Sequence, residues 1–220
     1  MARNKYPEIT EARILDTATK LFLEKGWEET TVQDIVDELG DITRGAFYHH
    51  FKSKDDIIDA VTTRMFLGNN PFKAVEESKS LNGLQKIQYV LKFSLQRPDT
   101  LQFSQVASSV LQSPIYIGKQ VLDSINSMAP FFTQYILEGI NDGSIHVKNP
   151  KQTAETMILL LNIWLSPLIF PDTKEDYMEK YEHLKLMYEG IGLPVFDDEM
   201  QMLVEKLYDG VAAYLSLIHI

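Results

Sequence analysis

The chain has 220 residues, of which 45% are apolar, and a formal net charge of −10. This length is enough to bury a substantial core in one or two domains. The sequence contains no cysteine, which excludes a disulfide framework and thiolate metal sites. Residues 1–11 are polar, and the most apolar segment, residues 157–170, is shorter than the ~20 residues of a membrane span. We therefore expect a soluble, cytoplasmic protein.

The first predicted helix spans Thr10 to Lys25. Its apolar side chains recur at the three- and four-residue spacing that places them on one helix face. They are Ile14, Leu15, Ala18, Leu21 and Phe22.

Two short helices joined by a tight turn are predicted between Thr31 and Phe51. The first has an apolar face made of Val32, Ile35, Val36 and Leu39. Gly40 ends this helix, because glycine tolerates the backbone of a C-terminal cap, and Thr43 is a suitable N-cap for the next. Phe47 and Phe51 define the buried side of the second helix. At about 100° per residue, the other side carries Gly45 and His49, flanked by Ala46 and Tyr48.

Charge separates this region from the rest of the chain. Residues 42–54 contain no Asp or Glu, whereas residues 8–41 contain ten. Within the acid-free window, Arg44, Lys52 and Lys54 are basic. DNA recognition requires cations for phosphates and helix side chains that reach base edges. The pattern favours helix-turn-helix DNA binding, and an ordinary solvated helix hairpin is the alternative that it leaves open.

The segment from Thr43 to Lys54 reads TRGAFYHHFKSK. It resembles the recognition helix of TetR-family transcriptional regulators and matches each defined position of that family's signature. Upstream positions that also fit are Ala18, Leu21, Phe22, Gly26, Trp27, Thr30, Thr31, Val32 and Ile35. The resemblance covers about the first 65 residues. It implies a homodimeric repressor that a small-molecule effector releases from a palindromic operator.

One feature departs from the family pattern. Such proteins usually place four steps between the glycine that ends the second helix and the glycine of the recognition helix. Here Gly40 to Gly45 is five steps. We expect a slightly longer turn that changes the tilt between the two helices and leaves the recognition-helix contacts intact.

The remaining sequence also shows helical periodicity, so the predicted fold is all-α. Residues 1–54 are expected to form a three-helix, helix-turn-helix DNA-binding head, and helix four, residues 53–68, to link it to the body. Residues 70–220 are expected to form a helical effector-binding and dimerisation domain. Its predicted helices span Leu81–Gln96, Asp99–Gln112, Pro114–Asp142 with a bend at Pro130, Pro150–Phe170, Lys174–Glu189 and Asp197–Leu217.

The predicted DNA contacts lie on or beside the recognition helix. Arg44 is the expected base reader, with a preference for guanine, and Thr43 enters the groove beside it. Tyr48 and His50 are expected to hold phosphates, and Arg13 lies off the apolar stripe of its helix, from which it can reach them. The complete set is Arg13, Thr31, Thr43, Arg44, Gly45, Ala46, Tyr48, His49, His50 and Lys54.

A single short helix contacts too few bases for useful specificity, so we expect the protein to act as a two-fold dimer. Two broad apolar stripes in the body suit the interface of that dimer. Plain subunit core is the alternative. The predicted interface residues are Leu160, Leu161, Trp164, Leu168, Leu203, Val204, Leu207 and Val211.

Aromatic side chains of the body can line a pocket for a small apolar or cationic effector. Membership of the core is again the alternative. The predicted pocket residues are Phe93, Phe103, Tyr116, Phe131, Phe132, Tyr135 and Trp164.

The sequence contains no nucleophile elbow, phosphate loop or His/Glu metal spacing. We therefore expect no enzymatic activity, no cofactor and no metal site. The expected partners are a double-stranded DNA operator, a second copy of the chain and a small-molecule effector, with no membrane. The alternatives are a helical adaptor that acts through protein contacts and a transcriptional activator.

Overall fold

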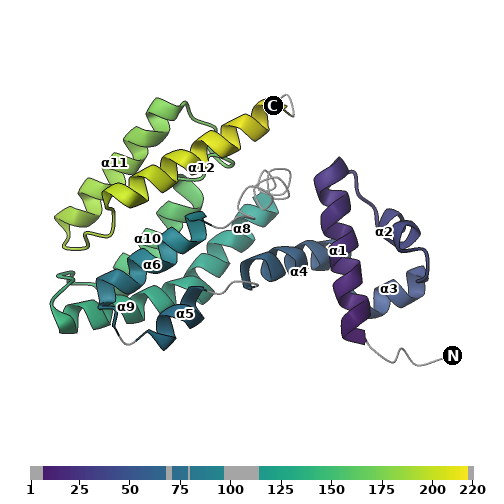
Figure 1. The fold of residues 1–220 in the computed structure, drawn as a ribbon, viewed down its shortest axis with the longest axis horizontal. Coiled ribbons are helices and arrows are strands. Elements are labelled where there is room, and N and C mark those ends of the chain that lie inside the picture. Colours follow the sequence, from purple (N-terminus) through teal and green to yellow (C-terminus); the bar gives the residue numbers. More distant parts are fainter. Residues whose placement is uncertain (1–6, 68–70, 79, 97–113, 218–220) are drawn as a thin grey trace. The chain divides into compact units, whose positions relative to one another are not determined.

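The computed structural model describes residues 7–67, 71–78, 80–96 and 114–217, and every regular element within them is a helix (Figure 1). This confirms the all-α prediction. The described residues form two compact units, one ending at residue 67 and the other beginning at residue 71. None of the described helices combines the length and the apolar character needed to cross a membrane.

The first unit is built around its N-terminal helix. Its elements are α1 (Pro7–Lys25), α2 (Val32–Leu39), α3 (Arg44–His50) and α4 (Lys54–Leu67). α1 packs against α2 and α4, and α2 packs against α3. The apolar stripe predicted for α1 is buried, and α1 packs it against α2 and α4. The core of this unit includes Ile14, Ala18, Phe22, Ile35, Val36, Phe47, Phe51, Ile57 and Val61.

The second unit contains the remaining described helices. Its elements are α5 (Pro71–Glu77), α6 (Gly83–Gln96), α8 (Pro114–Asp123), α9 (Ala129–Asp142), α10 (Pro150–Leu159), α11 (Lys174–Gly190) and α12 (Asp198–Leu217). α9 lies against α6 and α10, and α6 also contacts α5 and α12 (Figure 1). The short helix α5 was not predicted. The helix predicted over Asp99–Gln112 lies outside the described residues.

The helix predicted over Pro114–Asp142 is continuous but irregular just before Pro130. Between α8 and α9, residues Ser124–Met128 form a π-helical turn, and the amide of Ala129 donates to the carbonyl of Ser124. In a regular α-helix the ring of Pro130 would clash with the carbonyl four residues earlier. The wider turn relieves that conflict.

The helix that begins at Pro150 is shorter than predicted. A π-helical turn over Leu160–Trp164 follows α10, and the amide of Leu165 donates to the Leu160 carbonyl at 2.8 Å. The prediction that this helix continues to Phe170 is wrong. Pro167 has no amide hydrogen to donate and restricts the residue before it to non-helical backbone.

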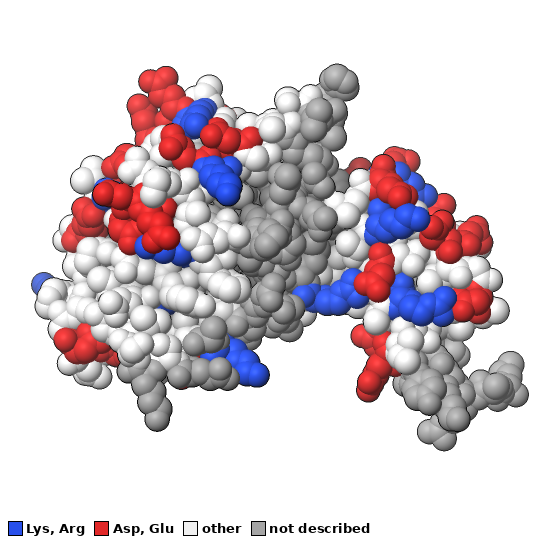
Figure 2. Space-filling view, viewed as in Figure 1, with Lys and Arg blue, Asp and Glu red and all other residues white. Residues whose placement is uncertain are grey.

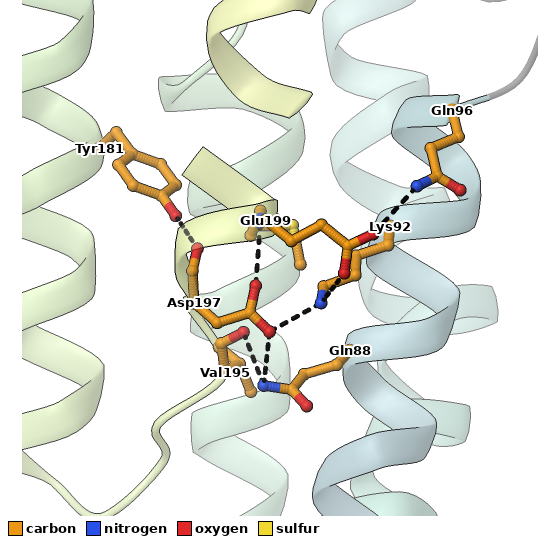
Figure 3. A network of polar contacts seen from close by, with 8 residues as sticks. Gln88, Lys92, Gln96, Tyr181, Val195, Asp197 and Glu199 are labelled. Atoms are coloured by element: carbon orange, nitrogen blue, oxygen red, sulfur yellow. Dashed lines mark hydrogen bonds and ion pairs between the residues drawn. The ribbon is translucent and has the colours of Figure 1, made fainter. Parts of the chain in front are cut away.

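A polar network joins α6 to the start of α12 (Figure 3). The Lys92 ammonium on α6 lies 2.7 Å from an Asp197 carboxylate oxygen and 2.6 Å from Glu199. The other Asp197 oxygen accepts the amide of Met200 at 2.9 Å and so caps α12. Helix α12 therefore begins one residue later than predicted, with Asp197 as its cap.

Candidate nucleic-acid interface

Helix α2 is held at both ends by local interactions. The Thr31 hydroxyl accepts the amide of Asp34 at 3.1 Å, and the Asp34 carboxylate accepts the amide of Thr31 at 2.6 Å. Gly40 ends the helix with a left-handed φ of 73°, and its amide donates to the Val36 carbonyl at 3.1 Å. The capping box and the glycine cap fix where the turn to α3 begins.

Helix α3 starts at the predicted cap and buries the predicted side. The Thr43 hydroxyl accepts the amide of Ala46 at 3.1 Å. Phe47 is completely buried and Phe51 nearly so. Both therefore hold α3 against the core of the first unit.

The opposite side of α3 is open to solvent. Arg44, Gly45, Tyr48 and His49 are exposed. The Arg44 guanidinium lies 5.8 Å from the centre of the Tyr48 ring, at the outer limit of a cation–π contact. Within the described part of the chain, Arg44 forms no ion pair with a carboxylate. Its charge is therefore available to an anionic partner. Of the other predicted α3 contacts, Ala46 and His50 are half-buried.

The two other cations of the predicted set already have partners inside the first unit. Lys54 is half-buried, donates to the Glu28 carbonyl at 2.9 Å and lies 4.3 Å from the centre of the Trp27 ring. Burial lowers its pKa, although nearby carboxylates oppose the shift. Arg13 binds both carboxylate oxygens of Asp41, at 2.8 and 2.9 Å. Figure 2 shows Lys and Arg side chains beside Asp and Glu side chains over this unit.

The hydroxyl of Thr31 is also engaged, because it lies 2.7 Å from an Asp34 carboxylate oxygen, to which it donates. The predicted set omitted Lys52, which is exposed and lies in the acid-free window. It also omitted Asp41, which binds the Arg13 guanidinium, 28 residues away in the sequence. The charge window was sufficient to find Lys52, but no local signal pointed to Asp41.

The predicted pocket residues have different surroundings. Phe132 and Tyr135 are buried and lie against Phe72, whereas Phe131 is exposed and stacks on Phe72 with ring centres 4.6 Å apart. Phe93, Tyr116 and Trp164 are half-buried. Phe103 lies outside the described residues.

Two shallow hollows lie elsewhere on the second unit. One, of about 260 Å³, is lined by Ile125, Ala129, Pro130, Thr133, Lys151 and Glu155. The other, of about 490 Å³, is lined by Glu175, Met178, Glu179, Glu182, His183, Leu186 and Gln201. Neither includes a predicted pocket residue, so the pocket assignment stays a prediction.

The residues predicted for the dimer interface differ in how far they are buried within the subunit. Val204 and Val211 are buried within the subunit. The remaining six, Leu160, Leu161, Trp164, Leu168, Leu203 and Leu207, are half-buried. These six have surface to offer a second copy, and the interface itself stays a prediction.

Two family models match the chain. Residues 14–61 match the model described as bacterial regulatory proteins, tetR family. Residues 102–186 match the model described as tetracyclin repressor-like, C-terminal domain. The first match contains the complete α2–turn–α3 segment.

Individual transcriptional regulators are similar to a short part of the chain or to most of it. The HTH-type transcriptional repressor KstR2 of Rhodococcus jostii is 48% identical over 48 residues, which are 22% of this chain and 23% of the repressor. An uncharacterised HTH-type transcriptional regulator of Bacillus subtilis, YhgD, is 26% identical over 154 residues, covering 67% of this chain and 78% of that protein. The chain spans less than a quarter of the length of the first curated relatives that it matches.

Solved structures share the fold. RolR in complex with its ligand resorcinol has a TM-score of 0.59 at 16% identity, covering 92% of this chain and 96% of RolR. At this level of identity the match concerns the fold alone.

Proposed function

The chain belongs to the TetR family of bacterial regulatory proteins, and on this premise we propose that it is a DNA-binding transcriptional regulator. Members of this family bind DNA and are not enzymes. We propose further that it acts as a homodimeric repressor and that a small-molecule effector releases it from a palindromic operator.

The exposed side of α3 is the observation that carries the proposal. It presents the guanidinium of Arg44, the Tyr48 hydroxyl and the uncovered backbone at Gly45, with no acidic side chain in the helix. A helix with this surface can enter the major groove, where arginine makes paired hydrogen bonds to guanine. Lys52 and the side chains of Tyr48 and His50 would then face phosphates, which supply most of the affinity.

Dimerisation follows from the size of that surface. One seven-residue helix contacts few base pairs, so two heads on half-sites about 34 Å apart, or a multiple of this, are needed for specificity. Partly exposed apolar residues such as Leu160, Leu203 and Leu207 are available for the contact. An effector that weakens operator binding a hundredfold needs a coupling free energy of only about 2.7 kcal/mol.

Fluorescence anisotropy on DNA flanking the chain's own gene tests the proposal. The wild-type protein should bind one fragment tightly, and Arg44→Ala should weaken that binding by about 10- to 100-fold, the value of one good base contact. Lys148→Ala is the matched control, because Lys148 is an exposed cation in the loop between α9 and α10. Binding by Arg44→Ala that equals the wild type would contradict the assigned role of α3.

A further inference from the structure

Three cations of α1 pair with three carboxylates that lie on α2 or in the turn after it. The pairs run in opposite order along the two segments: Lys25 with Asp34 at 2.9 Å, Lys20 with Glu38 at 2.6 Å, and Arg13 with Asp41 at 2.8 Å. We call this set the α1–α2 ion-pair row. It uses acidic residues that the sequence places just before the acid-free window.

The last pair of the row differs from the other two. Asp41 lies in the turn, between the glycine cap of α2 and the Thr43 cap of α3. Arg13 holds it through two parallel N–H···O hydrogen bonds, at 2.8 and 2.9 Å. A guanidinium matches a carboxylate in this way, whereas a lysine ammonium acts as a point charge. Asp41 also belongs to the turn that is one residue longer than is usual in the family.

We propose that Arg13 is a positioning residue for DNA binding, which acts by clamping Asp41 and thereby fixes the direction of α3 relative to α2. It does this in place of the phosphate contact predicted from the sequence. The inference rests on the proposed DNA binding by α3, but the clamp itself is a property of the free protein.

The energetics favour a clamp over a phosphate contact. To reach a phosphate, Arg13 would exchange two charge-assisted hydrogen bonds for similar ones and leave Asp41 unpaired near a polyanion. The unpaired Asp41 carboxylate and the DNA phosphates would repel each other. The exchange would therefore cost more free energy than the new contact with phosphate supplies. The hydrogen bonds from Arg13 also lower the pKa of Asp41, which keeps the carboxylate charged and the pair intact. Both side chains are exposed, so the pair adds little to the stability of the fold, and the proposal concerns the direction of α3 alone.

The substitutions Arg13→Lys, Arg13→Gln and Asp41→Asn test the clamp by operator binding over a range of salt concentrations. Each should weaken binding to a similar extent, by roughly fivefold, which corresponds to about 1 kcal/mol. The dependence of affinity on salt should stay that of the wild type, because no phosphate contact is lost. Arg13→Lys is the decisive variant, since it keeps the charge and loses the paired geometry.

Two controls separate the clamp from general charge effects. Lys20→Gln breaks the neighbouring pair of the row without touching the turn. Asp37→Asn removes an exposed carboxylate from α2. Both should bind within about twofold of the wild type. Wild-type affinity in Arg13→Lys, combined with a salt slope reduced by about 0.9 in Arg13→Gln, would overturn the proposal in favour of a phosphate contact. Tighter binding by Asp41→Asn than by Asp37→Asn would do the same.

Amide hydrogen exchange tests the clamp without DNA. In Arg13→Lys and Asp41→Asn, the Ala46 amide, which the Thr43 hydroxyl protects, should exchange faster. The Ile35 amide inside α2, bonded to the Thr31 carbonyl, should be unchanged. If the Ala46 amide exchanges faster in these variants but the wild type binds no operator, the clamp is upheld and the proposed function is refuted. Unchanged exchange at Ala46 would refute the clamp.

Discussion

Gly45 on α3 has open space where a side chain would lie. A Cβ built there would meet only the Thr43 hydroxyl oxygen, at an ordinary contact distance of 3.9 Å. Glycine inside a helix costs about 0.5–1 kcal/mol relative to alanine. Packing within the described head therefore does not require glycine at this position, and the proposed entry of α3 into a DNA groove gives the uncovered backbone a use.

The variant Gly45→Ala should therefore change stability and binding in opposite directions. We expect the free energy of unfolding to rise by about 0.5–1 kcal/mol. Operator affinity should fall by at least roughly threefold, because the added methyl group separates α3 from the groove. Urea denaturation and anisotropy measure the two effects. Gly118→Ala, at an exposed α8 position with nothing within 4 Å, should stabilise without changing affinity. Unchanged affinity in Gly45→Ala would argue against the close approach.

The contact between α6 and α9 depends on glycine for the opposite reason. A Cβ at Gly83 would lie 2.1 Å from the backbone nitrogen of Gly139, and a Cβ at Gly139 would lie 2.4 Å from the side chain of Ile145. The Gly83 amide also donates to the Asp142 carboxylate at 2.8 Å. The start of α6 thus lies directly against the backbone near the end of α9. The two helices can approach this closely only because neither Gly83 nor Gly139 has a side chain.

Gly83→Ala should destabilise the second unit strongly. Backbone atoms cannot rotate away as side chains can, so we expect a loss of about 3 kcal/mol, at the upper end of the usual cost of overpacking. Urea denaturation followed by circular dichroism measures this. The same substitution at Gly118 provides the comparison and should be slightly stabilising. Equal stability of the two variants would show that the α6–α9 crossing tolerates a methyl group.

Several acidic side chains are held in the folded protein by hydrogen bonds that favour their charged form. The hydrogen bond from Lys25 lowers the pKa of Asp34 in the first unit. In the second unit, hydrogen bonds from Ser144 and the Gly83 amide lower the pKa of Asp142. Burial opposes the shift at Asp197, but the hydrogen bond from Lys92 lowers its pKa. Carboxylates of both units are therefore more favourable when charged in the folded protein.

Acid should consequently destabilise both units. A carboxylate with a depressed folded pKa stabilises the protein fully above its unfolded pKa of about 4, and this contribution disappears as the pH falls through the folded pKa. The melting temperature should stay constant from pH 7 to about 5 and fall steadily below about 4. Circular dichroism melts at each pH check this. Asp197→Asn should have a lower melting temperature than the wild type at pH 7, and its melting temperature should fall less on acidification. A wild-type melting temperature that rises below pH 4 would contradict the prediction.

Much of the head was predictable from the sequence because the signals are local. Caps such as Thr31, Gly40 and Thr43 act on residues three or four positions away, so their types and spacing are sufficient to place α2 and α3. The buried side of α3 follows from the one-turn spacing of Phe47 and Phe51. The DNA contacts assigned to its exposed side remain predictions, and so do the domain boundaries.

The sequence alone thus determined the all-helical class, the course of the helix-turn-helix segment and the side of α3 that is buried, since each depends on neighbours within one or two helical turns. Only the tertiary structure decided that Arg13 pairs with Asp41 rather than with another of the ten nearby acidic residues. The same holds for the partners of Lys54 and for the close crossing at Gly83. These depend on distances between helices, which the packing of the core sets and which no local pattern encodes.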